Sequence, residues 1–333
     1  MTQSQPITQA PEVLCLGEVL LDCLADQPGL PYERVQSWTP YPGGAPANVA
    51  CALVKLGTPA AFLGCVGDDA AGRSLVELLQ QTGVNIVGLQ RHATAPTRQV
   101  YVVRTLEGDR QFAGFGKRDT TEFADTRLQA DRLPEALFTA ADYLVLGTLE
   151  LAYADSRTAI LKALELAEKY YVKLFVDVNW RPVFWHDQEA AKQLIQEFIH
   201  GVDFLKLSAE EADWLFTTQD PAVIAHRLEN LEGVLITDGD RGCHYYLGER
   251  LGHVPAFPVQ VEDTTGAGDA FVAGFVHQLC QQGVQALSHP ETARQMVQYA
   301  SAVGALTTTR AGAIAAQPTA AEVEAFLYLY QHQ

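Results

Sequence analysis

Short apolar runs and longer amphipathic stretches alternate along much of the chain. Residues 13–16 and 60–66 are apolar runs of strand length, whereas residues 47–56 and 73–81 repeat apolar side chains at helical spacing. Each of the two helical stretches is followed by a glycine, the residue that most often ends a helix. Because strands that alternate with helices along a chain form parallel sheets, this pattern predicts an α/β fold.

The alternation resumes in the middle of the chain and continues towards its end. Further strands are predicted over 143–146, 174–178, 204–207 and 234–237, and helices over 156–170, 188–199, 267 onward, 291–306 and 320–330. The sequence contains neither a repeat nor a low-complexity linker. We therefore predict one α/β core domain with a mostly parallel central sheet flanked by helices.

One segment interrupts this alternation. Two half-polar strand patterns, Gln99–Val103 and Gln111–Phe115, flank Glu107-Gly108-Asp109, which is typical of a β-hairpin turn. Together with a strand predicted near Leu20, this hairpin would form a small sheet separate from the main one.

Composition narrows the class of partner. The 333 residues include 40 acidic and 23 basic side chains, which gives a formal net charge of -17. Such a charge argues against nucleic acid or an anionic membrane as partner, since both demand clustered Lys and Arg. No segment approaches the length of a membrane-spanning apolar run, and the N-terminal residues lack a secretory signal pattern. The six cysteines form no Cys-x-x-Cys pair and are interpreted as reduced thiols, so we expect a cytoplasmic protein.

The run Asp263–Phe271 carries the strongest chemical signal. Gly266 and Gly268 lie where a helical pattern begins, so unpaired N–H groups and the positive end of the helix dipole would favour an anion there. Asp269 lies in the same turn. A carboxylate beside an anion site is unfavourable unless it takes a proton from a nucleophile that attacks the anion, as in phosphoryl transfer. The alternative is a glycine-rich turn in which Asp269 only caps the helix.

Two common nucleotide-binding motifs are absent from the sequence. Phe271 occupies the third position after Gly268, which breaks the dinucleotide fingerprint, and no glycine-rich loop is followed by Gly-Lys-Ser/Thr. The first absence argues against an oxidoreductase, and the second against a P-loop kinase. A nucleotide-dependent kinase with this sequence would belong to another lineage.

Four motifs in order span most of the chain and resemble those of one family. They are Gly43-Gly44-Ala45-Pro46-Ala47-Asn48-Val49-Ala50, Asp177-Val178-Asn179-Trp180-Arg181 followed by Trp185, Thr237-Asp238-Gly239-Asp240-Arg241-Gly242, and Asp263–Phe271. From about Val13 to about Leu329 the chain resembles the ribokinase/PfkB family of carbohydrate kinases, and within it is most similar to fructokinases. The resemblance implies a flexible tail over 1–12 and a ribokinase-like kinase domain over 13–333. A β-sheet lid formed by about 20–42 and 97–118 would cover the sugar site.

The resemblance implies an ATP-dependent sugar kinase, most similar to fructokinases that make fructose 6-phosphate. Asp269 would accept the proton of the primary hydroxyl, while the amides of Gly266, Ala267 and Gly268, with Mg²⁺, would hold the developing charge. Two alternatives remain open: a kinase for aminoimidazole riboside or another riboside, and a non-catalytic sugar or nucleotide sensor. Retention of Asp269 with both glycines favours the enzyme, because a sensor needs no positioned base.

The resemblance also implies roles for residues outside this run. The sugar site would comprise Asp22, Gly43, Gly44, Asn48, Arg98 and Phe112, and Thr237, Gly239 and Gly242, with Gly266 and Gly268, would contact ATP. Arg181 would bridge to the transferred phosphate. Without the resemblance, Asp22 is equally well a surface residue at a strand end, Asn48 a polar residue at a helix N-terminus, and Asp238-Gly239 a hairpin turn.

Metal sites are implied in the same way. Glu211 would order waters around Mg²⁺, although Ser208 stands where the family motif more often has Asn. A K⁺ ion would be surrounded by Asp263, Thr265, Thr307, Arg310 and Gly312, although Ala316 replaces a frequent Ser. The resemblance is compatible with a homodimer.

Overall fold

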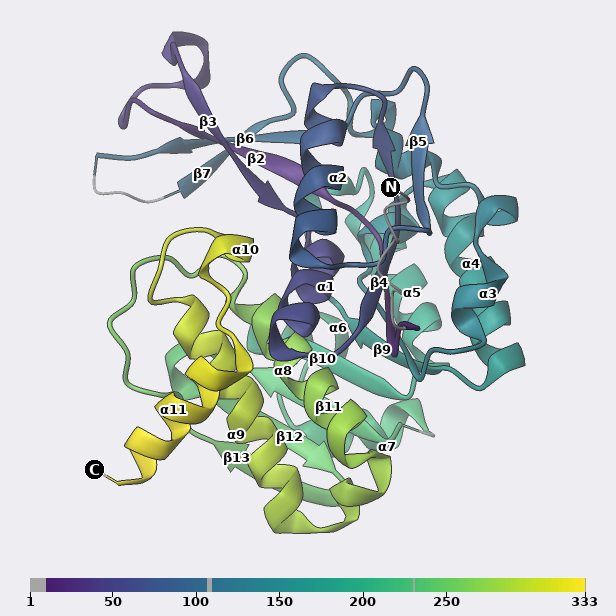
Figure 1. The fold of residues 1–333 in the computed structure, drawn as a ribbon, viewed down its shortest axis with the longest axis vertical. Helices are drawn as coiled ribbons and strands as arrows, with labels where there is room; N and C mark the ends of the chain where they lie inside the picture. Colours follow the sequence, from purple (N-terminus) through teal and green to yellow (C-terminus); the bar gives the residue numbers. More distant parts are fainter. Residues whose placement is uncertain (1–9, 107–109, 230, 333) are drawn as a thin grey trace, which may run out of the picture.

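The apolar runs of the sequence become the strands of one large sheet in the computed structural model, which describes residues 10–106, 110–229 and 231–332 (Figure 1). The strands are β1 Val13–Leu16, β4 Ala60–Gly67, β5 Leu89–His92, β8 Tyr143–Leu146, β9 Lys173–Asp177, β10 Phe204–Ser208, β11 Gly233–Thr237, β12 Cys243–Leu247 and β13 Arg250–Val254. Within the described residues they pair in the order β13-β12-β11-β10-β9-β8-β1-β4-β5. Every pair from β11 to β5 is parallel, and β12 and β13 join antiparallel at one edge, so the predicted mostly parallel sheet is confirmed.

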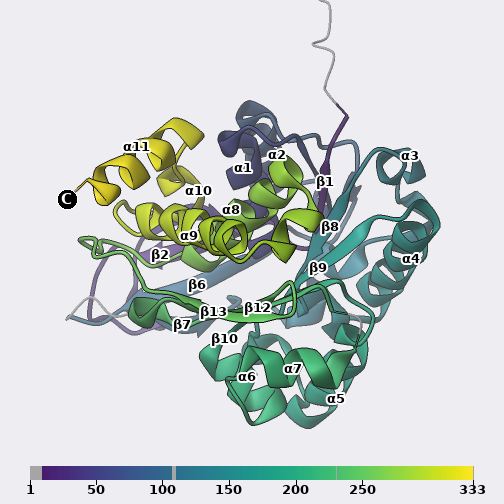
Figure 2. The same cartoon turned by 90° about the horizontal axis from the view of Figure 1, so that it is seen from below.

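Helices cover both faces of this sheet (Figure 2). They are α1 Ala45–Leu56, α2 Ala70–Thr82, α3 Glu135–Phe138, α4 Ala154–Tyr170, α5 Gln188–Ile199, α6 Ala209–Phe216, α7 Pro221–Leu228, α8 Ala267–Gln282, α9 Pro290–Thr307, α10 Ala313–Ala316 and α11 Ala320–Gln331. Helices α1, α2, α8 and α9 lie on one face, and α4 to α7 lie on the other (Figure 2). No helix in the described part of the chain is both long and apolar enough to cross a membrane.

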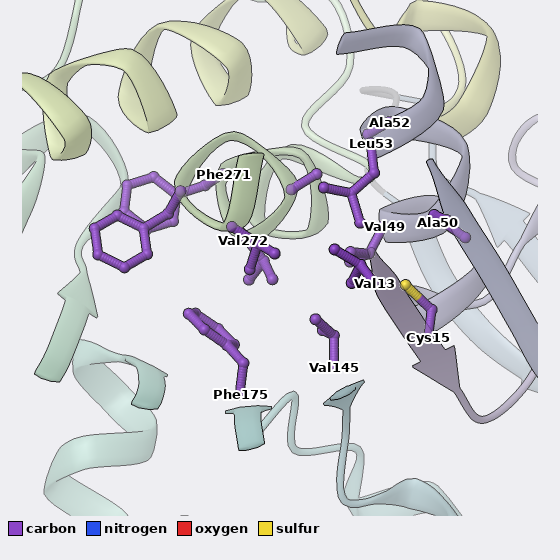
Figure 3. Packing of buried hydrophobic residues seen from close by; sticks show 14 of the residues in the cluster. Val13, Cys15, Val49, Ala50, Ala52, Leu53, Val145, Phe175, Phe271 and Val272 are labelled. Carbon is purple, nitrogen blue, oxygen red and sulfur yellow. The ribbon is translucent and has the colours of Figure 1, made fainter. Parts of the chain in front are cut away.

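The strand period of two residues decides which side chains meet which helices. Val13 and Cys15 of β1 pack in one cluster with Val272 of α8, whereas the intervening Leu14 packs in a second cluster with Ile160 of α4. Figure 3 shows Val13 and Cys15 with Val272 in the first cluster. Because both faces are buried, the central strands are apolar at nearly every position, as parallel strands usually are.

A second, smaller sheet stands beside the first, at one side of Figure 1. It contains β2 Leu20–Ala25, β3 Trp38–Gly43, β6 Gln99–Arg104 and β7 Arg110–Gly114, which pair within the described residues in the order β3-β2-β6-β7. The predicted hairpin is the antiparallel pair of β6 and β7. Its turn, 107–109, lies outside the described residues, as does most of the predicted tail.

An apolar cluster joins the small sheet to the core. Leu20 of β2 and Val100 of β6 pack with Phe115, Phe123 and Phe184, all of which are buried. The strands of the small sheet therefore begin from a fixed base and extend away from it (Figure 1).

Candidate active site

Two cavities meet at the N-terminus of α8. The larger has a volume of about 610 Å³, and Thr264, Ala267 and Gly268 form part of its wall. The smaller has a volume of about 320 Å³, and its wall includes Gly266 and Asp269. The first turn of α8 therefore separates the two cavities. A group held by this turn would be accessible from both sides.

The backbone of this turn requires a glycine at its first position. Gly266 is the N-cap of α8 with a φ of 78°, in the left-handed region that favours glycine. A Cβ at this position would also lie 2.9 Å from the Cβ of Ala313. The Ala267 N–H donates to the Thr264 carbonyl over 3.3 Å, a long hydrogen bond, so this amide would be shared with any bound anion.

Asp269 is 9% exposed and is held from two sides. Its Oδ2 accepts a hydrogen bond of 2.7 Å from Asn48 Nδ2, and its Oδ1 accepts one of 3.4 Å from Asn179 Nδ2. Asn179 has a φ of 42°, a left-handed conformation that asparagine tolerates better than most residues. Burial raises the pKa of Asp269, while the hydrogen bond from Asn48 and the charges of Arg181 and Lys206 act in the opposite direction. A carboxylate with a raised pKa is a stronger base once it is ionised.

The smaller cavity brings together residues that are far apart in the sequence. Asp22 comes from β2, Gly44 and Asn48 from the start of α1, Phe112 from β7, and the exposed Arg181 from the segment after β9. All five were predicted to contact the sugar or the transferred phosphate. Their common cavity supports that prediction.

Two of the predicted sugar-site residues do not line this cavity. Gly43 stands behind Asp22, and a Cβ there would lie 2.6 Å from the Asp22 Oδ2, so this glycine makes room for the carboxylate. Arg98 has a side-chain exposure of 0% and forms an ion pair with Asp125, with 3.0 Å between Nη2 and Oδ1. Its guanidinium also lies over the ring of Phe123, 4.6 Å from the centroid. In the structure Arg98 fastens the start of β6 to the core, and its contact with the sugar stays a prediction.

Glu18 lines the smaller cavity and was missed by the sequence analysis. Its Oε1 accepts a hydrogen bond of 2.8 Å from the Ala45 N–H, which fixes the double glycine ahead of α1. Burial raises the pKa of Glu18 to about 7. Glu18 lies two residues beyond the apolar β1, and a carboxylate so near the C-terminal end of a parallel strand could have identified it.

The larger cavity is lined by both apolar and polar residues. Thr237, Gly239 and Gly242, which were predicted to contact ATP, line this cavity together with the apolar side chains of Phe257 and Val261. Gly242 has a φ of 93°, and a Cβ there would lie 2.1 Å from the Val254 carbonyl oxygen. A cavity that combines apolar side chains with a helix N-terminus suits a ligand with a flat ring and an anionic tail.

Glu211 is tied into the backbone around it. One carboxylate oxygen accepts a hydrogen bond of 2.6 Å from the Trp180 N–H, and the other accepts one of 2.7 Å from the Ser208 N–H. Ser208 caps α6 in return, by accepting from the Glu211 N–H, so it can replace the more frequent Asn as a helix cap. The described residues contain no group of three or more His, Cys, Asp or Glu side chains that could hold a metal ion.

The segments predicted to surround K⁺ are joined by Asp263. Its Oδ1 accepts hydrogen bonds from the N–H and hydroxyl of Thr265, and its Oδ2 accepts one of 2.9 Å from the Gly312 N–H. The side chains of Thr307 and Arg310 have other partners, the Val303 carbonyl and Glu322. The Arg310 guanidinium has no lone pair for a cation, so Arg310 could contribute only its backbone carbonyl.

A buried ion pair that was not predicted lies beneath the first turn of α8. Lys206 of β10 is 6% exposed, and its Nζ lies 3.0 and 3.2 Å from the two carboxylate oxygens of Asp177. The signal was present in the sequence, because Lys206 is the only charged residue of an otherwise apolar strand, Phe204–Ser208.

Comparison with known proteins places this geometry in context. Residues 10–320 match the family described as pfkB family carbohydrate kinase. The chain is 34% identical to a probable fructokinase-5 of Arabidopsis thaliana, over 96% of this chain and 98% of that protein. The ATP-bound fructokinase of Xylella fastidiosa has a similar structure, with a TM-score of 0.86 and 31% identity over 96% and 98% of the two chains. A fructokinase double mutant from Vibrio cholerae O395, bound to fructose, ADP and a potassium ion, gives a TM-score of 0.82 with 28% identity over 96% and 98%.

Proposed function

Because this chain belongs to the pfkB family of carbohydrate kinases, we propose that it is a fructokinase that transfers the γ-phosphate of ATP to a primary hydroxyl of fructose. The observation that carries the proposal is the meeting of two cavities at the first turn of α8, with Asp269 on the side of the smaller cavity. ATP would occupy the larger cavity and the sugar the smaller one. The similarity to fructokinases over nearly the whole chain supports fructose as the sugar.

The chemistry proposed for each residue follows from its place. Asp269 would accept the proton of the sugar hydroxyl as that oxygen attacks the γ-phosphorus and the bond to the β-phosphate oxygen breaks. The N–H groups of Gly266, Ala267 and Gly268 would hold the charge on the transferred group, with Arg181 at the exposed rim. Asp22 and Asn48 would hold the sugar hydroxyls, and Asn48 would also keep the Asp269 carboxylate in place.

Metal ions would assist from the nucleotide side. Mg²⁺ would neutralise charge on the phosphates, and Glu211 would reach its hydration shell through water. A K⁺ ion at the loop containing Asp263 and Gly312 would stabilise the turn that precedes α8. The contact from Asp263 to the Gly312 N–H supports this site, since it brings the two contributing segments together.

A substrate panel tests the proposal. ATP-dependent ADP release is measured with fructose, glucose, mannose, ribose and several ribosides, and we expect the highest kcat/KM with fructose. If a riboside is preferred by tenfold or more, the kinase assignment stands and fructose is the wrong substrate. If none of these acceptors is phosphorylated although ATP and sugar both bind, the protein is a sensor instead of an enzyme.

A further inference from the structure

Lys206 is an unusual residue for its position in the fold. It lies on β10, between β9 and β11, where parallel strands are covered on both faces and are normally apolar. Alternation along the strand places Leu205 and Leu207 against the cluster beneath α4 to α7 and Phe204 against α8. Lys206 therefore points to the α8 face, where an apolar side chain would be expected. An ammonium at such a depth is costly unless it is paired.

The pairing with Asp177 makes this burial tolerable. β9 and β10 are in register so that Lys206 and Asp177 are direct cross-strand neighbours, and the ammonium contacts both carboxylate oxygens. An ion pair of this kind gives little net stability compared with two apolar side chains of similar volume. Stability alone is therefore a poor explanation for its presence in the middle of the sheet.

The position of the ammonium relative to α8 supplies another explanation. A Cβ placed on Gly268 would lie 3.3 Å from the Lys206 Nζ, and this is the nearest heavy atom it would meet. Gly268 lies in the first turn of α8, between the two cavities. The charge of Lys206 thus lies directly beneath the first turn of α8, without a side chain from Gly268 between them.

The charges around this turn show what the ammonium offsets. Three buried carboxylates, those of Asp177, Glu211 and Asp269, surround the Lys206 ammonium, whereas Arg181 is exposed at the rim. The thiol of Cys243, on β12, also lies near the ammonium. This thiol is neutral, because burial raises its pKa to about 12. A phosphate group that arrives at α8 would face more buried negative charge than positive charge without Lys206.

We propose that Lys206 is a positioning residue of the phosphate-holding turn, which places a fixed buried positive charge beneath the amide of Gly268 and beside Asp269. This inference rests on the proposed function of the same site. Through Gly268, the ammonium strengthens the hold of the turn on phosphate. Beside Asp269, it favours the ionised form that accepts a proton. Asp177 holds the ammonium in place.

The test compares two variants that differ only at position 206. Asp177→Asn keeps the ammonium and removes its partner, whereas Asp177→Asn with Lys206→Met removes both charges of the pair. We expect kcat with fructose to be lower in the double variant by about 10² to 10³, the usual effect of losing one group that stabilises developing charge. The KM for fructose should change by less than about threefold, because Lys206 does not line the smaller cavity.

A pH profile separates positioning from a merely structural role. The acidic limb of kcat/KM should lie at higher pH in the double variant than in Asp177→Asn, because Asp269 has lost a neighbouring cation that lowers its pKa. If both variants have the same kcat and the same acidic limb, the proposal is overturned while the fructokinase assignment stands. If the methionine variant does not fold, Lys206→Gln with Asp177→Asn offers a neutral, hydrogen-bonding replacement for the same comparison.

Nucleotide binding provides a readout that needs no sugar. Calorimetry should show that the double variant binds a non-hydrolysable ATP analogue about tenfold more weakly than Asp177→Asn, which corresponds to about 1.4 kcal/mol. Equal affinities would contradict the proposal even if fructose proves to be the wrong substrate. A wild-type protein that binds the analogue but phosphorylates no acceptor would contradict the proposed function instead.

Discussion

Replacing Asp269 by asparagine should separate catalysis from stability in this site. The variant Asp269→Asn keeps the shape of the side chain but cannot accept a proton. We expect kcat to fall by about 10² to 10⁴, the usual contribution of a general base, which corresponds to about 3 to 5 kcal/mol in the activation barrier. ATP affinity should stay near the wild-type value, because Asp269 lines the smaller cavity and not the larger one.

The same change should not lower the thermal stability at alkaline pH. Burial raises the pKa of Asp269, so keeping this carboxylate ionised costs free energy in the folded state. A carboxyl group whose folded pKa lies above its unfolded value destabilises the protein progressively as the pH rises through that window. A neutral amide has no such cost. It loses a charge-assisted hydrogen bond to Asn48, worth about 1.5 to 3 kcal/mol, but it can accept a neutral one from the same donor.

Two measurements on Asp269→Asn and the wild type check this reasoning. Turnover is measured at saturating fructose and ATP, and Tm is measured at pH 5 and pH 8. The Tm of Asp269→Asn minus the Tm of the wild type should be larger at pH 8 than at pH 5. Asp131→Asn, an exposed carboxylate on a short helical turn, serves as the matched control and should change neither quantity. Wild-type turnover in Asp269→Asn would refute its role as base, and a lower relative Tm at pH 8 than at pH 5 would refute the cost of burial.

Three further outcomes are expected. Asp22→Ala should lower kcat/KM for fructose by up to about 10⁴ without weakening ATP binding. The ratio of kcat/KM between fructose and its deoxy analogues should also become smaller. An unchanged ratio would mean that the sugar lies elsewhere. Activity should rise when K⁺ replaces a bulky organic cation at constant ionic strength, and indifference to K⁺ would remove the site at Asp263. Glu18→Gln should stabilise the protein more at pH 8 than at pH 5, because the raised pKa of Glu18, about 7, means that its ionisation opposes folding above that range; equal Tm shifts at both pH values would contradict this.

Periodicity predicted the main sheet well because its strands are buried on both faces. The strand predicted over Tyr143–Leu146 and the helix over Gln188–Ile199 agree with the structure at both ends. The strand β3 was missed, since Trp38–Gly43 contains two prolines and half its residues are exposed. The β12–β13 hairpin was also missed, although Gly248-Glu249, both with positive φ, lies between two alternating segments and is a recognisable turn signal.

The site was less predictable than the fold. A motif shows which residues belong together in the sequence, but it does not show where each side chain points in the folded protein. The resemblance to the family led to Asp22, Asn48 and Asp269, which share one cavity. Arg98 could not be placed in the same way, since its partner Asp125 is 27 positions away in the sequence and nothing local specifies that pairing. Lys206 was overlooked for a related reason. Its position becomes informative only through its closeness to Gly268, which lies on another element and has no side chain.

The two prolines of β3 also affect how this protein behaves in a crowded solution. β3 is an edge strand, and Pro40 and Pro42 are two positions apart, so the missing N–H groups belong to the same side of the strand. Because β3 pairs with β2 along its whole length, that side is the outer one. An exposed sheet edge is a template on which another extended chain can add and begin a fibril. Without donors at positions 40 and 42, this edge cannot continue the hydrogen-bond ladder, so the β3 edge of the small sheet is protected against edge-to-edge aggregation.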